Sequence, residues 1–209
     1  MGHPVLKYKD KKDKKDKKDK KREMLLVNRI EALELLKKYN SNESLLKHAY
    51  SVEAVMRYFA QLKNEDEDYW GNIGLIHDLD YEMFPDQHCE MTKKILEERD
   101  VAEDIIRAIM SHGYGLCTEV EPERYMEKVL YTIDELTGLV TATVLMKPDK
   151  SIEGLEVKSV MKKFKTSKFA AGVNRDVILK GCTMIEMKLP EVIAHVISGM
   201  TTASDAIGL

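Results

Sequence analysis

The sequence predicts an all-α fold. Apolar residues recur with helical spacing wherever a period can be read, and no stretch alternates polar and apolar residues over more than a few positions. The boundaries agree, because Asn40 and Asn42 separate the first two predicted helices and Pro148 follows the long sixth one. With 209 residues, of which 44% are hydrophobic, the chain can bury one sizeable core. We therefore expect one folded unit.

Nine helices are expected, each with an apolar stripe that would face the core. In chain order they span residues 27–38, 43–62, 65–77, 87–98, 102–110, 122–146, 156–164, 175–187 and 190–198. Pro122 and Pro190 suit first-turn positions, where a missing N–H costs nothing, and Gly113 suits a helix end. The least periodic stretches, 147–155 and 166–174, are candidate flaps.

The stripes of four of these helices matter most for function. They consist of Leu45, Ala49, Val52, Met56 and Phe59; Met91 and Ile95; Ile105 and Ile109; and Met126, Val129, Leu130, Ile133, Val140 and Val144. Residues at these spacings lie on one side of a helix, so a polar side chain within a stripe points toward the core.

Charge divides the chain into two parts. The first 22 residues carry 11 Lys or Arg against 4 Asp, whereas the other 187 carry 22 Lys or Arg against 32 Asp or Glu. The Lys-Lys-Asp repeat cannot offset its ordering entropy by burial, so residues 1–23 are expected to be a disordered leader. Because Met24 resembles a native start, we interpret the leader as an engineered solubility tag rather than a natural basic tail. Residues 24–209 then form a single domain, and its acidic balance argues against a nucleic-acid polymer as partner.

Membrane and disulfide signals are both weak. No apolar run approaches the ~20 residues that a membrane-spanning helix needs, so no membrane association is expected. Cys89, Cys117 and Cys182 are odd in number and lack close metal-ligand spacing, which favours reduced thiols in the cytoplasm. They are interpreted as bystanders.

Histidines and aspartates form the most informative pattern of the chain. Neutral imidazole and ionised carboxylate are the groups that hold borderline-hard divalent metals. Four of the six histidines join two aspartates in an ordered series: His48, His77, Asp78, His88, His112 and Asp134. The series predicts a metal site.

Position within the predicted helices supports this interpretation. His48, His88 and His112 are each placed on an apolar stripe, and Asp134 lies on the flank of another, whereas Glu135 is expected to face water. A single inward histidine is more often a hydrogen-bonded core residue. Four of them together with two aspartates are hard to satisfy by ordinary hydrogen bonds, and a shared cation would satisfy all of them. The other histidines, His3 and His195, are expected to lie outside the site.

The spacing resembles that of the HD-domain superfamily of metal-dependent phosphohydrolases, which is named after a His-Asp doublet. The minimal family pattern is met by His48, His77, Asp78 and Asp134, and His88 and His112 are similar to the extra ligands of its dinuclear branch. That branch includes symmetrical diadenosine tetraphosphate hydrolases and cyclic-dinucleotide phosphodiesterases. The resemblance covers residues 45–146 and implies a helical bundle, here with additional C-terminal helices.

The resemblance also implies roles for the ligands. His48, His77 and Asp134 would bind one divalent ion, His88 and His112 a second, and Asp78 would bridge the two. Iron or manganese is favoured by the resemblance, while zinc, cobalt and nickel also suit these ligand types. The implied reaction is hydrolysis of a phosphate ester or phosphoanhydride of a small molecule, a nucleotide, by a metal-activated water.

Residues beyond the ligands are assigned from their places in the sequence. The acidic stretch 80–86 is expected to be a loop at the mouth of the site, and Asp80 is predicted to join Asp78 in catalysis by protonating the leaving group. A solvated acidic loop is the alternative. Lys47, Arg107 and Lys147 are predicted to bind phosphate, although most basic residues here, Arg175 among them, are typical of solvent-facing positions.

Two other functions are compatible with the same residues. The six ligands also resemble those of mixed-valent di-iron oxygenases in the superfamily, which oxidise a polyol or phosphonate with dioxygen. A metal-stabilised binding or signalling module without turnover is the third interpretation.

Overall fold

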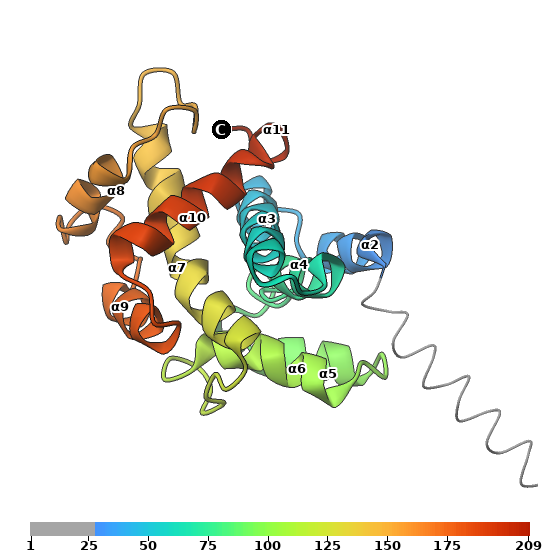
Figure 1. Ribbon diagram of the computed structural model, residues 1–209. Coiled ribbons are helices and arrows are strands. Elements are labelled where there is room, and N and C mark those ends of the chain that lie inside the picture. Colours follow the sequence, from blue (N-terminus) through green and yellow to red (C-terminus); the bar gives the residue numbers. More distant parts are fainter. Residues whose placement is uncertain (1–27) are drawn as a thin grey trace, which may run out of the picture.

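The computed structural model describes residues 28–209, and within this range it contains ten α-helices, two short 3-10 helices and no β-strand (Figure 1). The predicted all-α class is confirmed. The α-helices are α2 (Arg29–Tyr39), α3 (Glu43–Lys63), α4 (Glu67–Leu75), α5 (Glu90–Glu97), α6 (Glu103–Met110), α7 (Tyr125–Leu145), α8 (Val157–Phe164), α9 (Arg175–Met184), α10 (Leu189–Thr201) and α11 (Ser204–Ile207). The 3-10 helices are η1 (Pro85–Gln87) and η2 (Ser111–Gly113). The predicted leader, residues 1–23, lies outside the described residues.

Side-chain caps determine where several helices begin. Asn28, Asn42, Asp66 and Asn174 precede α2, α3, α4 and α9, and each side-chain oxygen accepts a hydrogen bond from a backbone N–H of the first turn. Each cap satisfies a donor that the helix cannot satisfy itself, which stabilises a helix by about 1 kcal/mol.

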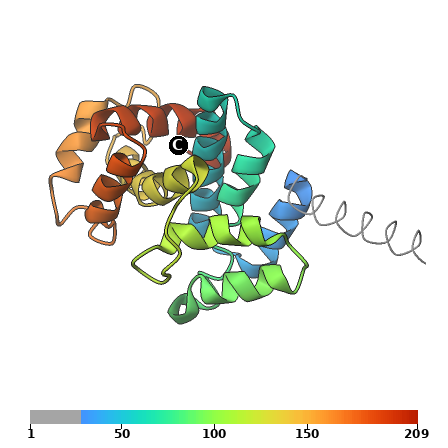
Figure 2. The same cartoon turned by 60° about the horizontal axis from the view of Figure 1, so that its bottom comes forward.

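The core is built around α3 and α7. Helix α3 packs on α4, α7 and α10, and α7 also packs on α8 and α9 (Figure 1). The views in Figures 1 and 2 agree that α5 and α6 lie side by side below this group. Gly199 of α10 allows this helix to approach α3 closely, because a Cβ atom there would lie 2.8 Å from the Cα of Val55. One hydrophobic cluster extends from Ala32 in α2 to Ile207 in α11.

Two predicted helix boundaries beside the metal-site residues differ from the structure. Helix α4 ends at Leu75, so His77 falls in the turn after it. Helix α5 begins at Glu90, because Cys89 adopts a left-handed φ of 68° that interrupts any earlier helix. His88 therefore precedes the helix instead of lying on its inward face. His112 belongs to η2, where α6 tightens into a 3-10 turn.

The long helix α7 starts later than Pro122 because of a buried carboxylate. Glu127 accepts hydrogen bonds from the backbone N–H groups of Glu123 and Arg124 and from the side chains of Arg124 and Arg107. These bonds form a capping box that fixes Arg124 as the residue before the helix. Pro190, by contrast, occupies the first turn of α10 as predicted.

The two candidate flaps are held to the protein by basic side chains. Arg175 donates hydrogen bonds to five backbone carbonyls of the 164–173 segment: those of Phe164, Thr166, Phe169, Ala170 and Val173. Lys147 donates to the carbonyls of Ser151 and Glu153 in the other segment. Both stretches are therefore ordered loops.

No helix within residues 28–209 combines the length and the apolar character that crossing a bilayer requires.

The Glu127 network generates a stability prediction. Replacement Glu127→Ala removes the acceptor of four hydrogen bonds, two of them from arginines, and should lower the free energy of unfolding by about 2 kcal/mol. Glu123→Ala is the matched control, because Glu123 also pairs with Arg107 but its side chain is 74% exposed. It should cost about 0.5 kcal/mol or less. Equal losses in urea unfolding would contradict the assigned role of Glu127.

The same network predicts a pH dependence. Burial opposes ionisation of Glu127, but the N–H groups of Glu123 and Arg124 and the two arginines outweigh it and lower the pKa of its carboxyl below 4.5. A group whose pKa is lower in the folded state contributes stability above its unfolded pKa and loses it as the pH falls through the folded value. The difference in unfolding free energy between wild type and Glu127→Ala should therefore shrink below pH 4.5.

Candidate metal centre

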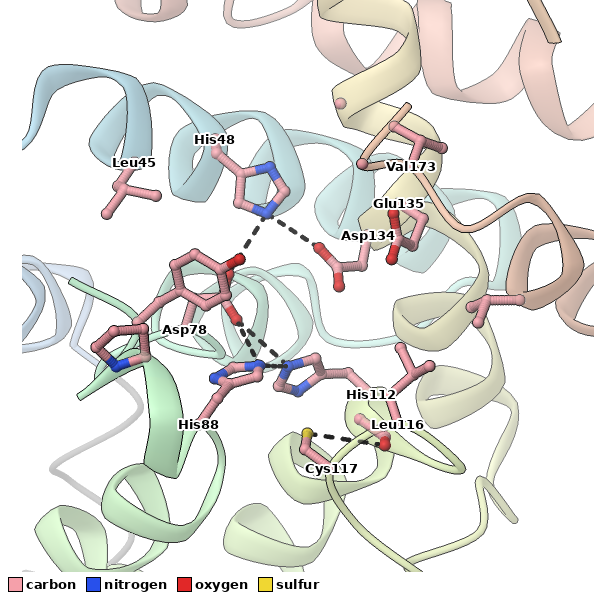
Figure 3. Close-up of a pocket in the computed structure, with 16 residues that line it drawn as sticks. Leu45, His48, Asp78, His88, His112, Leu116, Cys117, Asp134, Glu135 and Val173 are labelled. Atoms are coloured by element: carbon pink, nitrogen blue, oxygen red, sulfur yellow. Dashed lines mark hydrogen bonds and ion pairs between the residues drawn. The ribbon is translucent and has the colours of Figure 1, made fainter. Parts of the chain in front are cut away.

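The structure brings all six predicted metal ligands close together, beside a cavity of about 490 Å³ at which Figure 3 shows His48, Asp78, His88, His112 and Asp134. They arrive from five separate segments of the chain: His48 from α3, His77 and Asp78 from the turn after α4, His88 from the residue before α5, His112 from η2 and Asp134 from α7. Five of the six line the cavity, and the sixth, His77, is completely buried behind it.

The ligands form two groups that share one carboxylate. In the first, Asp134 Oδ1 lies 3.0 Å from His48 Nε2 and 3.2 Å from His77 Nε2. Asp78 Oδ2 completes it, 3.4 Å from His77 Nε2. In the second group, Asp78 Oδ1 lies 3.3 Å from His112 Nε2 and 3.6 Å from His88 Nε2. Asp78 thus directs one oxygen toward each group (Figure 3).

Every imidazole of the cluster is oriented by a partner of its Nδ1 atom. His77 and His112 donate to the carbonyls of Gly74 and Ile109, and His88 Nδ1 lies 2.8 Å from a carboxylate oxygen of Asp80. His48 Nδ1 lies 3.4 Å from the hydroxyl oxygen of Thr137, whose proton is donated to the carbonyl of Asp134. Because these partners accept a proton from Nδ1, each Nε2 points into the cluster and offers its lone pair there when the ring is neutral.

With the rings in this orientation, hydrogen-bond acceptor atoms face one another inside the cluster. His88 Nε2 and His112 Nε2 are 3.2 Å apart, and Asp78 Oδ1 is buried without a hydrogen-bond partner among the described residues. Lone pairs at such distances repel each other, and a buried polar atom left unpaired costs about 1–3 kcal/mol. A cation between these atoms resolves both problems, so the residues fit a bound metal ion.

Electrostatics favour positive charge at the same place. Burial works against a charged His77 ring, but the nearby carboxylates of Asp78 and Asp134 outweigh it and raise the pKa of His77 well above its ordinary value. Burial likewise opposes ionisation of Asp78, yet His77 and His112 lower the pKa of that carboxyl. The cluster is therefore an anionic centre that attracts either protons or metal ions.

In the structure Asp80 does not lie at the mouth of the site but is buried behind His88. Its side chain is fully buried, with one oxygen bound to His88 Nδ1 and the other accepting the backbone N–H of Thr92 at 2.8 Å. The expected exposed proton donor is thus corrected to a carboxylate that orients His88. Loop residues after it do reach the cavity, since Tyr81 and Pro85 line it.

The three predicted phosphate-binding residues lie away from the cavity. Arg107 pairs with Glu127 and Glu123, and Lys147 holds the 151–153 loop. Lys47 pairs with Glu43 and lines a neighbouring hollow of about 380 Å³ that it shares with His48. None of the described residues that line the metal-site cavity is Lys or Arg.

Glu135 and Tyr81 are cavity residues that the sequence pattern missed. Glu135, expected to face water, lines the cavity and accepts the backbone N–H of Asn174 at 3.0 Å, and burial raises the pKa of its carboxyl. The loop before α9 covers this flank of α7, which helical periodicity alone does not reveal. The Tyr81 ring stands edge-on to His88 with ring centroids 5.1 Å apart, and its place three residues after the doublet was the available signal.

Two cysteines expected to be bystanders lie next to the cluster: Cys117 lines the cavity, and Cys89 is buried beside it. The Sγ atoms of Cys89 and Cys117 are 3.0 Å apart, and Cys89 Sγ is 3.8 Å from His112 Nε2. The hydrogen bond between the thiols lowers the pKa of Cys117 to about 6 and raises the pKa of Cys89. His195 lies outside the cluster, as expected, with its ring half-buried beside Tyr58 and Phe59.

Comparison with known proteins adds no assignment: no family model matches the chain, and no solved structure matches its fold. The geometry itself establishes a helical protein with a His/Asp cluster that could hold metal.

Metal content gives the first test of the cluster. Asp78→Ala removes the one side chain among residues 28–209 that belongs to both ligand groups, and it should reduce bound metal per folded chain to near zero, measured by elemental analysis after purification without chelator. His195→Gln, which alters a half-buried histidine outside the cluster, should retain the wild-type metal content. Similar metal content in the two variants would disprove the ligand assignment.

Asp80 gives a second, graded test. Asp80→Ala frees the His88 ring to rotate and should weaken metal affinity by about 10- to 100-fold without removing a ligand. Asp86→Ala, an exposed acid of the same loop, is the control and should bind metal as the wild type does. Competition titrations with a chromophoric chelator measure both affinities, and unchanged affinity in Asp80→Ala would contradict the positioning role.

Proposed function

We propose that the protein is a metal-dependent phosphohydrolase of the HD-domain type, which cleaves a phosphate ester or phosphoanhydride of a small molecule, a nucleotide by preference. The observation that carries the proposal is the placement of Asp78, with one oxygen toward His48 and His77 and the other toward His88 and His112. A carboxylate shared by two groups of imidazoles would suit a pair of divalent ions, one held by each group.

In this proposal the His/Asp cluster holds the metal ions, and neighbouring groups orient the imidazole rings. His48, His77 and Asp134 bind one divalent ion, iron or manganese by preference, while His88 and His112 bind the other. Two bound ions would lower the pKa of a water molecule toward neutrality and stabilise the charge that develops on phosphate. Asp80 and the carbonyls of Gly74 and Ile109 keep the imidazoles in the tautomer that binds metal.

The residues that line the cavity indicate where each part of a phosphorylated substrate would bind. Because no Lys or Arg is found among the described residues lining it, the phosphate group would be bound at the metal pair itself. Two divalent ions bring four positive charges against the two aspartates, and this excess suits an oxyanion. The remaining wall is partly apolar, with Leu45, Tyr81, Pro85, Leu116 and Val173, and suits a flat organic group such as a nucleobase.

A second candidate function follows from the same wall. A cavity whose described lining lacks cationic side chains also suits an uncharged polyol, the kind of substrate that di-iron oxygenases of the superfamily oxidise. This alternative uses the same ligands and requires iron in both positions, with dioxygen as co-substrate.

One experiment separates the candidates. Protein stripped with chelator is reloaded separately with Mn²⁺, Fe²⁺, Co²⁺ or Zn²⁺ and screened against nucleoside mono-, di- and polyphosphates and simple phosphate esters. The proposal predicts phosphate release that depends on the metal and falls to background in Asp78→Ala, while Asp86→Ala remains active. Full metal occupancy without phosphate release would overturn the hydrolase proposal, and oxygen uptake by the iron form with a polyol would favour the oxygenase.

A further inference from the structure

Two cysteines from different segments meet beside the His/Asp cluster. Cys89 directly follows His88 and is buried, whereas Cys117 lies in the exposed loop after η2 and lines the metal-site cavity. Their Sγ atoms are 3.0 Å apart. The third cysteine, Cys182, lies in α9 and is buried there.

Backbone conformation and close packing place the two sulfur atoms together. Cys89 has φ 68° and ψ −44°, near the γ-turn region that non-glycine residues rarely adopt and that strains the chain. Gly113 lies against both sulfur atoms. A Cβ atom on this residue would overlap Cys117 Sγ and would lie 2.8 Å from Cys89 Sγ. The space beside the pair is thus open only because residue 113 has no side chain.

We propose that Cys89 and Cys117 form a modification site, in which a hydroperoxide such as hydrogen peroxide oxidises the two thiols to an intramolecular disulfide. An S–S bond of about 2.05 Å requires the sulfur atoms to approach by only about 1 Å. The loop that bears Cys117 is exposed, with Leu116 57% accessible, so it can supply this small movement.

The reaction balances in two steps. Cys117, the accessible thiol, attacks one peroxide oxygen; an S–O bond forms, the O–O bond breaks, and a sulfenic acid and one water result. The Cys89 sulfur then displaces the hydroxyl group of that sulfenic acid, forming the S–S bond and releasing a second water. Two thiols lose two electrons and two protons in total, and the peroxide accepts them. A dithiol reductant reverses the modification.

The site can be tested on the purified full chain without any substrate. Protein is treated with a small excess of hydrogen peroxide, its remaining thiols are alkylated, and intact mass and peptide maps are recorded. We expect the loss of two hydrogen atoms, the disappearance of two of the three thiols, and one peptide pair linked through Cys89 and Cys117. Dithiothreitol should restore all three thiols.

Single variants sharpen the test. Cys182→Ser is the matched control and should form the disulfide as the wild type does. In Cys89→Ser the sulfenic acid has no partner, so Cys117 should proceed to sulfinic or sulfonic acid that dithiothreitol does not reverse. Three intact thiols after peroxide treatment, a disulfide between two chains, or a linkage that includes Cys182 would each overturn the proposal. The wild-type peptide map decides the outcome even if a variant fails to fold.

Discussion

Two largely buried carboxylates in a helical protein are the constraint on which the rest of this structure depends. Asp78 and Asp134 lie in a cluster with four imidazoles, and taking such charges out of water costs several kcal/mol per ion unless they are compensated. The compensation involves the backbone as well as the side chains. His77 and His112 donate from Nδ1 to Gly74 and Ile109, whose carbonyls belong to the last turns of α4 and α6.

This arrangement joins helix termination and ligand placement in one set of hydrogen bonds. The last carbonyls of a helix lack partners inside the helix and must be satisfied from outside. Here two of them are satisfied by the histidines that follow, and each bond also fixes the ring so that Nε2 faces the cluster. A change that lengthened α4 or α6 would therefore displace a ligand as well as a helix end.

Much of the fold and the ligand set could be predicted from the sequence, because periodicity and residue type record burial directly. His48 and Asp134 lie on α3 and α7, as their apolar stripes indicate. His88 and His112 reach the same cluster by another route, from a strained turn and a 3-10 helix. Helical periodicity predicted that His88 and His112 face inward. It could not predict the turn before α5 or the 3-10 helix, because these short segments have no repeating apolar pattern.

The remaining differences come from contacts between segments far apart in sequence. The sequence predicts Asp80 as a loop residue at the mouth of the site, but in the structure His88 and Thr92 enclose its carboxylate. The sequence likewise predicts that Arg107 binds phosphate, but in the structure Arg107 pairs with the buried Glu127. Charge pairs and caps of this kind depend on which side chains meet in space. A list of basic residues near ligands in the sequence therefore overestimates how many of them can reach a substrate.

The loop held by Arg175 fixes one wall of the metal-site cavity. Gly172 and Val173 line one wall of the cavity, and five carbonyls of their segment are tied to one guanidinium group, so this wall stays in place. Tyr81 and Leu116 also line the cavity, and their side chains are about half exposed. A molecule that approaches the cavity past these two exposed side chains would contact an aromatic ring and an aliphatic chain before it reaches the His/Asp cluster.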